Sequence, residues 1–269
     1  MSVGEKKIAD MESYNLAMSK SMIDKMFFMD KIDESVTTVF DFGCANGVLI
    51  GTLARLFPEM TYVGYDLDED MIRQAAERCK DCRNVFLFSS LTAFHDWARE
   101  QKLDFKKTAL NLSSLIHEVY SYGTPQSIED FWRFVTATGF GYIVIRDMCL
   151  DISAHRPALK EDVIKVRSSY DLNMIAQFEA LHGSITDNRN LIHFLLKYRY
   201  TDNWEREVNE NYLPVSVEDV MGKISAGKEK YRLIYFDHYI LPFLARSVKK
   251  DFDIVLKDYT HVKFIYELR

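Results

Sequence analysis

The fold is decided by residues 39–47, which read VFDFGCANG, and by the segment YVGYD at 62–66. The first segment passes from an apolar stretch into a turn that holds Gly43 and Gly47. Glycines at such positions let the backbone bend sharply and approach a bound molecule that a Cβ atom would push away. An apolar helix is predicted from about 48 to 56, and Pro58 helps to end it. The pattern therefore predicts a buried strand, a tight turn, a helix and a second strand.

The second strand ends in a carboxylate whose position is informative. Asp66 falls 19 residues after Gly47, at the carboxyl end of the predicted strand. A carboxylate at this place can accept hydrogen bonds from both hydroxyl groups of a ribose. The helix after the turn points its free N–H groups and the positive end of its dipole toward the same space. These features together predict a pocket for a cofactor that contains a nucleoside.

Two cofactor classes use this layout, and the position after the second glycine separates them. A dinucleotide site requires G-x-G-x-x-G/A, whose last small residue lets the helix pack closely on the strand. Val48 stands at that position, so a dehydrogenase is disfavoured. When the same stretch is read as G-x-G-x-G, the positions are Gly43, Ala45 and Gly47, with Asp41 in front of them.

This second arrangement resembles motif I of the class I S-adenosylmethionine-dependent methyltransferases. Asp66 matches the acidic residue with which that family binds ribose. Further resemblances lie at NVFLFSSL (84–91), TALNLSSLIHE (108–118) and GFGYIVIRD (139–147), which are similar to the family's third, fourth and fifth strands with their following turns. The resemblance covers roughly residues 11–150. The sequence departs from the family pattern at Ala45, which replaces the central glycine, and at Ser90, where the family often has aspartate facing adenine.

The resemblance implies S-adenosyl-L-methionine as cofactor and S-adenosyl-L-homocysteine as product. The motif I residues would hold the methionine end, Asp66 and Leu67 the ribose and adenine, and the 90–91 turn the adenine edge. Lys20, in a predicted N-terminal lid helix with Tyr14 and Ser21, could pair with the methionine carboxylate, the alternative being a solvated lysine. The expected cofactor-binding residues are Lys20, Asp41, Gly43, Cys44, Ala45, Gly47, Asp66, Leu67, Ser90, Leu91, Asn111 and Ser113.

Methyl transfer from a sulfonium is an in-line displacement, so the protein mainly orients the reactants, removes a proton and excludes water. Ligands of open α/β sheets bind at the carboxyl ends of the strands. We therefore predict His117, Glu118 and Asp147 as catalytic residues, with His117 as general base. The alternative is a histidine that only closes one side of the pocket, and Asn111 and Ser113 could equally form a structural turn. Weaker candidates are His155, Arg156, His238 and Tyr239.

The alternation of strands and helices predicts an α/β fold. We expect a doubly wound, mostly parallel seven-stranded sheet with helices on both faces and an antiparallel last strand. The chain is interpreted as one domain over 1–269. Within it we assign a lid helix at 11–32, a cofactor-binding half at 33–147, a helical substrate-side cap at 148–230 and the final strands at 231–269.

Three helical segments follow from apolar spacing and from the excess length between the strands. Residues 11–30 predict a methionine-rich amphipathic helix packed on the sheet. The cap should contain helices at 158–181 and 189–208. A connecting helix is expected from about 240 to 248, with Pro242 tolerated near its start.

Composition bounds the function classes. The chain has 269 residues, 48% of them hydrophobic, and a formal net charge of −6. Residues 1–135 carry 15 Lys and Arg against 21 Asp and Glu, and residues 136–269 carry 19 of each. A nucleic-acid enzyme more often has a basic face. A local patch of Lys197, Arg199, Lys249 and Lys250 beside Tyr198 and Tyr200 stays open, with solvated surface charges as the favoured interpretation.

The sequence also bears on location and on metal binding. The N-terminus lacks a secretory signal pattern and no apolar run approaches the roughly 20 residues that cross a bilayer, so we expect a cytoplasmic protein without a membrane partner. The four cysteines, including Cys44 and Cys149, suit reduced thiols. Cys79 and Cys82 have zinc-like spacing, but no second pair or histidine couple accompanies them, so no metal is predicted.

The function predicted from the sequence is transfer of a methyl group to an oxygen or nitrogen of a small-molecule or nucleotide-like acceptor. Structured RNA is the alternative acceptor. A second class remains open, namely a cofactor-binding sensor or partner subunit without transfer activity. Turnover of labelled methyl groups separates an enzyme from that class, and salt-sensitive RNA binding separates the acceptors. Oligomeric state cannot be read from the sequence.

Overall fold

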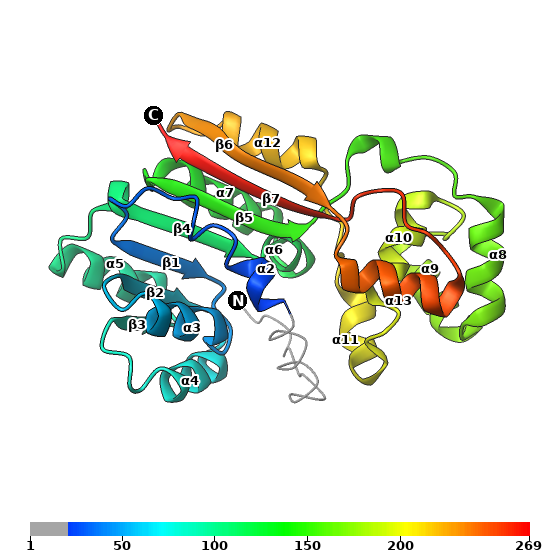
Figure 1. Cartoon of the computed structure of the whole chain (residues 1–269), viewed down its shortest axis with the longest axis horizontal. Helices are drawn as coiled ribbons and strands as arrows, with labels where there is room; N and C mark the ends of the chain where they lie inside the picture. The colour runs from blue at the N-terminus through cyan, green and yellow to red at the C-terminus, as the bar shows by residue number, and fades with distance from the viewer. Residues whose placement is uncertain (1–20) are drawn as a thin grey trace.

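The computed structural model describes residues 21–269, and within them the chain forms a seven-stranded sheet in the order β3-β2-β1-β4-β5-β7-β6. Strands β1 to β5 pair in parallel, and β7 is antiparallel to both of its neighbours. The predicted fold class is therefore confirmed (Figure 1). The strands are β1 Thr38–Phe42, β2 Thr61–Tyr65, β3 Val85–Phe88, β4 Thr108–Ser113, β5 Tyr142–Met148, β6 Tyr231–Tyr239 and β7 His261–Leu268.

The central strands are buried on both faces, as parallel strands between helix layers must be. Every residue of β4 is buried, and the first four residues of β1 are buried as well. Apart from the threonines that begin the two strands, Thr38 and Thr108, their polar residues lie toward the carboxyl ends, at Asp41 in β1 and at Asn111 and Ser113 in β4. The sheet thus brings polar side chains from separate strands to one edge.

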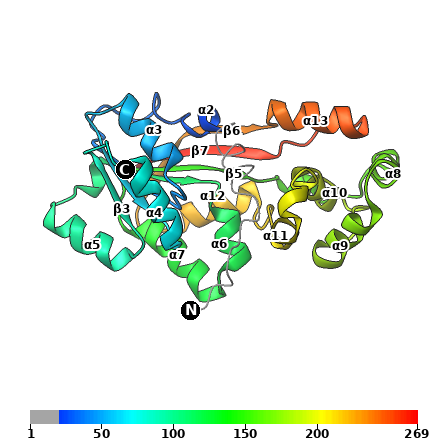
Figure 2. The ribbon, with the colours of Figure 1, turned by 90° about the horizontal axis from the view of Figure 1, so that it is seen from below.

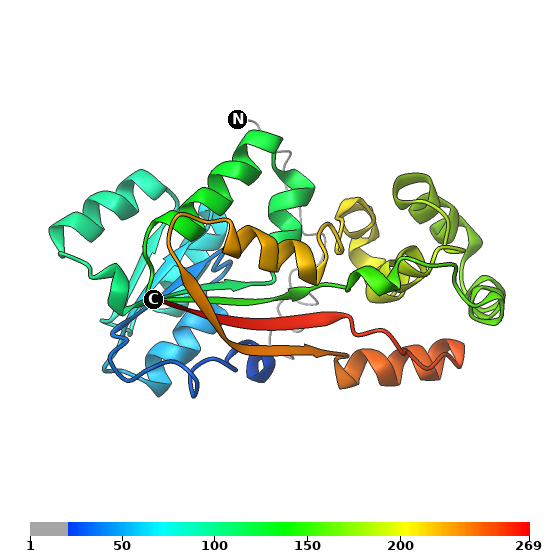
Figure 3. The same cartoon turned by 90° about the horizontal axis from the view of Figure 1, so that it is seen from above.

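Helices cover both faces of the sheet (Figures 2 and 3). One face packs against α3 (Val48–Leu56), whose neighbour α4 (Glu69–Arg78) also contacts β3. The other face packs against α5 (Leu91–Glu100), α7 (Pro125–Ala137) and α12 (Val217–Ser225). Helix α6 (Ile116–Tyr122) follows β4 directly and stands at the carboxyl edge.

A separate hydrophobic core lies beyond the carboxyl ends of the strands. It belongs to a helical bundle that we define as α8 (Lys160–Ser169), α9 (Leu172–His182), α10 (Asn188–Lys197), α11 (Trp204–Asn209) and α13 (Pro242–Phe252). Figure 1 shows this bundle beside the sheet. Helix α13, the expected connecting helix, joins the bundle, whereas α12 lies within the range assigned to the cap but packs on the sheet.

The two long helices expected at 158–181 and 189–208 are each broken. Tyr170 is extended, with φ −135° and ψ 162°, and Asp171 then begins α9 by accepting a hydrogen bond from the Asn173 backbone N–H at 2.7 Å. Aspartate is a strong N-cap residue because its side chain satisfies an otherwise free N–H. Helix α10 ends at Lys197, and a 3-10 turn at Thr201–Asn203 precedes α11.

The prediction of one helix over 11–30 is wrong for residues 21–30, the part of this range that the structure describes. Helix α2 spans only Met22–Lys25, and turns follow to residue 32. The chain turns here because Phe28 inserts fully into the core, and the Phe28 carbonyl accepts from the N–H groups of Lys31 and Ile32. The predicted packing against the sheet is confirmed for Met22, Met26 and Met29, while the rest of the predicted helix lies outside the described residues.

Candidate functional site

The turn after β1 is held in an unusual backbone conformation. Gly43, Ala45 and Gly47 all have positive φ, at 85°, 46° and 73°. The N–H groups of Gly43 and Cys44 both donate to the Tyr65 carbonyl, at 2.7 and 2.9 Å. A Cβ atom on Gly47 would stand 2.8 Å from the Cβ of Ala75, so only glycine fits there without displacement. The turn is thereby tied to β2 and kept open to the carboxyl edge.

Asp66 connects the end of β2 to this turn. Its Oδ2 accepts from the Ala45 N–H at 2.9 Å and its Oδ1 accepts from the Asp68 N–H at 3.0 Å. Each carboxylate oxygen can accept a further hydrogen bond, so the side chain keeps capacity for a ligand hydroxyl. The next residue, Leu67, is 72% exposed. A carboxylate beside an exposed apolar side chain suits a ribose with its attached base.

A buried polar pair lies below the turn. The Asn111 Nδ2 donates to Asp41 Oδ1 at 2.7 Å, and burial raises the pKa of Asp41 to about 6. The Oδ1 of Asn111 and the Oγ of Ser113 are buried, and within residues 21–269 neither has a hydrogen-bond partner. Buried polar atoms are rarely left unpaired. These oxygens are therefore suited to accept from a ligand that donates, such as an ammonium group.

Three of the predicted cofactor residues have structural tasks. Ser90 caps α5, its Oγ accepting from the Ala93 N–H at 3.4 Å, and Leu91 packs against the sheet core. The Cys44 side chain is also in the core, where burial raises its thiol pKa well above the ordinary value. Only the backbone of Cys44 can therefore face a ligand at the turn.

Helix α2 docks onto the same edge through charged side chains that sequence reasoning missed. Asp24 forms ion pairs with Arg146 (2.8 Å) and Lys263 (2.6 Å) and accepts from the Tyr239 hydroxyl at 2.7 Å. Lys25 is only 4% exposed, and burial lowers its pKa to about 8 while Asp41 and Asp147 act in the opposite direction. The signal was present in the sequence, since Lys25 stands three residues after Met22 and four before Met29, within an apolar stripe.

His117 and Asp147 form a buried pair where β4 and β5 end. The His117 Nδ1 lies 2.7 Å from Asp147 Oδ1, and Asp147 Oδ2 accepts from the backbone N–H of Ile116 at 2.7 Å. Burial acts to lower the pKa of His117, but the adjacent Asp147 carboxylate raises it above its usual value. The same pairing holds the Asp147 pKa below its usual value against the opposing effect of burial.

Glu118, the third predicted catalytic residue, faces the helical bundle. Its carboxylate pairs with Arg206 at 3.5 Å, and Arg206 also pairs with Glu210 at 2.8 Å. The ring of Tyr212 stands edge-on to the His117 ring, with centroids 5.3 Å apart. The segment after α11 therefore closes over the histidine.

Residues 39–138 match the family model described as a methyltransferase domain. The chain carries a methyltransferase domain over these residues. The predicted methyltransferase family is thereby confirmed, and the turn, Asp66 and the His117–Asp147 pair lie at the carboxyl edge of the sheet. No curated protein sequence is significantly similar to the chain.

Solved structures resemble the methyltransferase in fold. The methyltransferase domain of bacterial CtHen1-C superposes with a TM-score of 0.52 at 13% identity, covering 94% of this chain and 99% of that one. The pyocyanin biosynthetic protein PhzM gives 0.53 at 10% identity, covering 95% and 57%. A putative O-methyltransferase from Nostoc punctiforme gives 0.51 at 13% identity, covering 94% and 59%. At such identities the likeness concerns the fold alone.

The weaker catalytic candidates of the methyltransferase do not belong to the His117–Asp147 pair. Arg156 pairs with Asp258 at 2.9 Å, the His238 Nε2 lies 3.1 Å from the Cys149 carbonyl, and Tyr239 bonds to Asp24. His155 is exposed and lines a cavity beside the helical bundle. Lys20 and Tyr14 lie outside the described residues.

One residue of the possible basic patch, Lys197, does not lie on the surface. Lys197 is fully buried, and its Nζ donates to the carbonyls of Glu207 (2.7 Å) and Glu210 (2.5 Å), so the interpretation of Lys197 as a surface charge is wrong. The ammonium also lies 4.4 Å from the Tyr212 ring centroid. Arg199, Lys249 and Lys250 remain exposed.

Two further properties concern the cysteines and the helices. Cys79 is buried, Cys82 is partly buried and both are free thiols. In residues 21–269 no group of three or more His, Cys, Asp or Glu side chains is arranged to hold a metal ion. Over the same residues no helix combines the length and apolar composition needed to span a bilayer.

Proposed function

We propose that the methyltransferase transfers the methyl group of S-adenosylmethionine to an oxygen or nitrogen atom of a small-molecule or nucleotide-like acceptor, with His117 as general base. The observation that carries this proposal is the buried pair of His117 and Asp147 at the same sheet edge as the glycine turn. A histidine held by a carboxylate on one ring nitrogen is suited to take a proton on the other.

The polar atoms at the edge fit the cofactor. Asn111 Oδ1 and Ser113 Oγ, buried and without described partners, would accept from the methionine ammonium, with Asp41 adding negative charge nearby. Asp66 would accept from the ribose hydroxyls. The exposed Leu67 would cover one face of the adenine, and the Ser90–Leu91 turn its edge. When bound, the sulfonium supplies an electrophilic methyl carbon with a neutral thioether as leaving group.

The pair fixes the protonation of the histidine ring. An ionised Asp147 can only accept hydrogen bonds, so in the neutral ring His117 Nδ1 carries the hydrogen and Nε2 is left as an acceptor. We expect Nε2 to take the acceptor proton as the acceptor oxygen or nitrogen attacks. Arg206, Tyr212 and their neighbours on the helical bundle would exclude water from the site, because His117 is only 6% exposed with Tyr212 packed against it.

Charge supports a small acceptor over structured RNA. The formal net charge is −6, and the buried position of Lys197 leaves fewer cations for a nucleic-acid surface. Proteins that bind RNA depend on basic surfaces that neutralise phosphates.

The test is transfer of a labelled methyl group from S-adenosylmethionine to a panel of phenols, primary amines, nucleosides and a structured RNA. The proposal predicts turnover with one of the small molecules, strongly reduced in His117→Gln. His95→Gln is the matched control, because His95 is an exposed histidine on α5. Labelling of the RNA alone would move the acceptor to the other class. Binding of S-adenosylhomocysteine without any turnover would contradict transfer and favour a sensor or partner subunit.

A further inference from the structure

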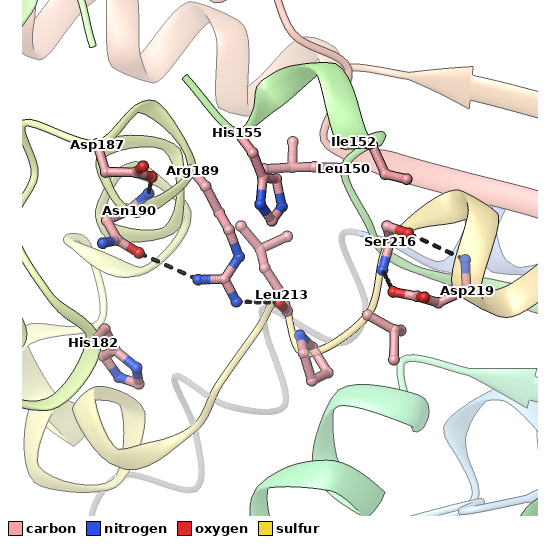
Figure 4. Close-up of a pocket in the computed structure, with 12 residues that line it drawn as sticks. Leu150, Ile152, His155, His182, Asp187, Arg189, Asn190, Leu213, Ser216 and Asp219 are labelled. Carbon is pink, nitrogen blue, oxygen red and sulfur yellow. Dashed lines mark hydrogen bonds between the residues drawn. The ribbon is translucent and has the colours of Figure 1, made fainter. Parts of the chain in front are cut away.

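A cavity of about 390 Å³ lies between the carboxyl end of β5 and the helical bundle (Figure 4). Its walls come from three stretches far apart in sequence, namely 150–155, 182–190 and 213–219. Pockets for small molecules commonly have volumes of roughly 300–1,000 Å³, so the space is large enough for a small ligand. It is assembled only when the bundle and the sheet pack together.

The residues that line the cavity form an apolar group and a polar group. One part is apolar and consists of Leu150, Ile152, Leu213, Pro214 and Val215. The remainder is polar and consists of His155, His182, Asp187, Arg189, Asn190, Ser216 and Asp219. An apolar lining with a few convergent polar groups is the usual composition of a small-molecule site, in which the polar groups set the orientation of the ligand.

Arg189 is the cation of this cavity. Its guanidinium donates to the Leu213 carbonyl at 2.5 Å and to Asn190 Oδ1 at 3.2 Å, and Figure 4 shows the side chain extending along the cavity wall. Both partners are uncharged, and among the described residues no carboxylate lies within ion-pair distance. A guanidinium has five N–H donors, so three stay available. Burial lowers the pKa of Arg189, an effect that Asp187 partly opposes.

The two carboxylates of the wall are already engaged. Asp187 Oδ1 accepts from the Asn190 N–H at 3.3 Å and caps α10, while Asp219 Oδ2 accepts from the Ser216 N–H at 2.9 Å in the capping box of α12. Helix N-termini stabilise negative charge through their free N–H groups and dipoles. The half-buried Arg189 guanidinium is therefore the charged group of the cavity that has no ion-pair partner among the described residues.

The cavity and the methyl-transfer site have different linings. Pro214 and Val215 line both the cavity and a smaller hollow that His117 and Asp147 border. Neither His117 nor Asp147 is among the residues that line the cavity.

We propose that this cavity binds a small organic anion, with a carboxylate on the Arg189 fork and a flat apolar body against Leu150, Pro214 and Val215. Arginine favours carboxylates because its planar fork matches their two oxygens. The proposal is independent of methyl transfer, because it concerns a second site and its readout is binding.

Benzoate is the probe, and benzylamine is its charge-reversed counterpart of similar shape. Saturable shifts of backbone amide signals in two-dimensional NMR should follow addition of benzoate to the full chain and should map to residues of the three wall stretches. Benzylamine should produce no such shifts. Arg189→Gln should lower the affinity for benzoate at least tenfold. Arg167→Gln, which changes an exposed arginine paired with Glu179, should leave the affinity for benzoate unchanged.

Arg189→Gln also removes the hydrogen bond to the Leu213 carbonyl, so a second variant is used to separate loss of binding from a folding defect. Ile152→Trp introduces bulk from an exposed position on the apolar wall without touching the guanidinium. It should abolish benzoate binding while the spectrum otherwise keeps its dispersion. The proposal is overturned if benzoate fails to shift these signals in the native chain, if benzylamine binds equally well, or if Ile152→Trp binds benzoate unchanged.

Discussion

Asp147 at the end of β5 reaches back thirty residues to His117 at the start of α6, with 2.7 Å between its Oδ1 and the histidine Nδ1. The same carboxylate accepts from the backbone N–H groups of Ile116 and Met148. One side chain thus orients the histidine ring and fixes the beginning of its helix. An orientation this strongly determined is what a general base requires.

The pH dependence of transfer should report the His117 pKa. A base acts in its neutral form, and Asp147 raises the pKa of His117 above the ordinary value of 6.5. We expect kcat to fall as pH decreases through this raised pKa, with a slope of one on a logarithmic plot, and to level off at higher pH. Rate measurements from pH 5 to 9 check this, and a kcat without an acid limb would contradict a histidine base.

Asp147→Asn should lower kcat by about 10²–10⁴-fold, the range typical of general acid–base groups. An amide can donate to Nδ1 and so favour the tautomer with hydrogen on Nε2, which cannot accept a proton. The acid limb should also move to lower pH, because the neighbouring negative charge is gone. Asp96→Asn, at an exposed aspartate on α5, is the control, and circular dichroism verifies folding. Unchanged kcat in folded Asp147→Asn would rule out this role.

Asp66→Asn should weaken binding of S-adenosylhomocysteine by about 10–100-fold. Hydrogen bonds to a charged group contribute roughly 1.5–3 kcal/mol, and the amide keeps only one acceptor oxygen for the turn and the ribose together. Calorimetric titration measures the change. Asp70→Asn serves for comparison, since Asp70 is exposed and pairs with Arg73. Equal affinity in Asp66→Asn and the native chain would remove Asp66 from the cofactor site.

The turn offers two opposite substitutions. Gly47→Ala should lower the free energy of unfolding by about 2–4 kcal/mol, because it adds a left-handed non-glycine residue and a contact 2.8 Å from Ala75. Ala45→Gly should leave it unchanged or raise it by up to about 1 kcal/mol, since glycine tolerates the φ of 46°. Urea unfolding measures both. A loss of stability in Ala45→Gly as large as in Gly47→Ala would contradict this geometry.

Lys197 should make stability depend on pH. Burial lowers its pKa in the folded state to about 7, whereas the unfolded value is 10.5. Between these values the unfolded chain binds the extra proton, so the free energy of unfolding from this group rises with pH. Between pH 7 and 9 the free energy of unfolding of the native chain should increase by on the order of 2 kcal/mol relative to that of Lys197→Met. Urea unfolding of both proteins at each pH tests this, and a difference that does not change with pH would refute it.

The sequence predicted those parts of the fold that depend on short-range pattern. Strand, glycine turn and carboxylate lie within residues 39–66, so Gly43, Gly47 and Asp66 could be placed before the structure was known. The order of elements followed from the alternation of strands and helices. Asp147 and His117 were predicted at one edge because parallel strands align their carboxyl ends.

What the sequence did not provide depends on long-range packing. Lys197 resembles a surface cation until the carbonyls of Glu207 and Glu210 are seen to surround its ammonium. The apolar stripe indicates that Lys25 is buried, but the docking of α2 at this edge through the Asp24–Arg146 ion pair depends on contacts between distant segments. The cavity around Arg189 needs three separate stretches, and no periodicity within one of them predicts the others.

The most direct test of the central claim is calorimetric titration of the purified full chain with S-adenosylhomocysteine and, separately, with NAD. The account predicts micromolar, one-to-one binding of S-adenosylhomocysteine and no heat of binding with NAD. Binding of NAD, or of neither compound, would contradict the assignment of the glycine turn and Asp66 to S-adenosylmethionine.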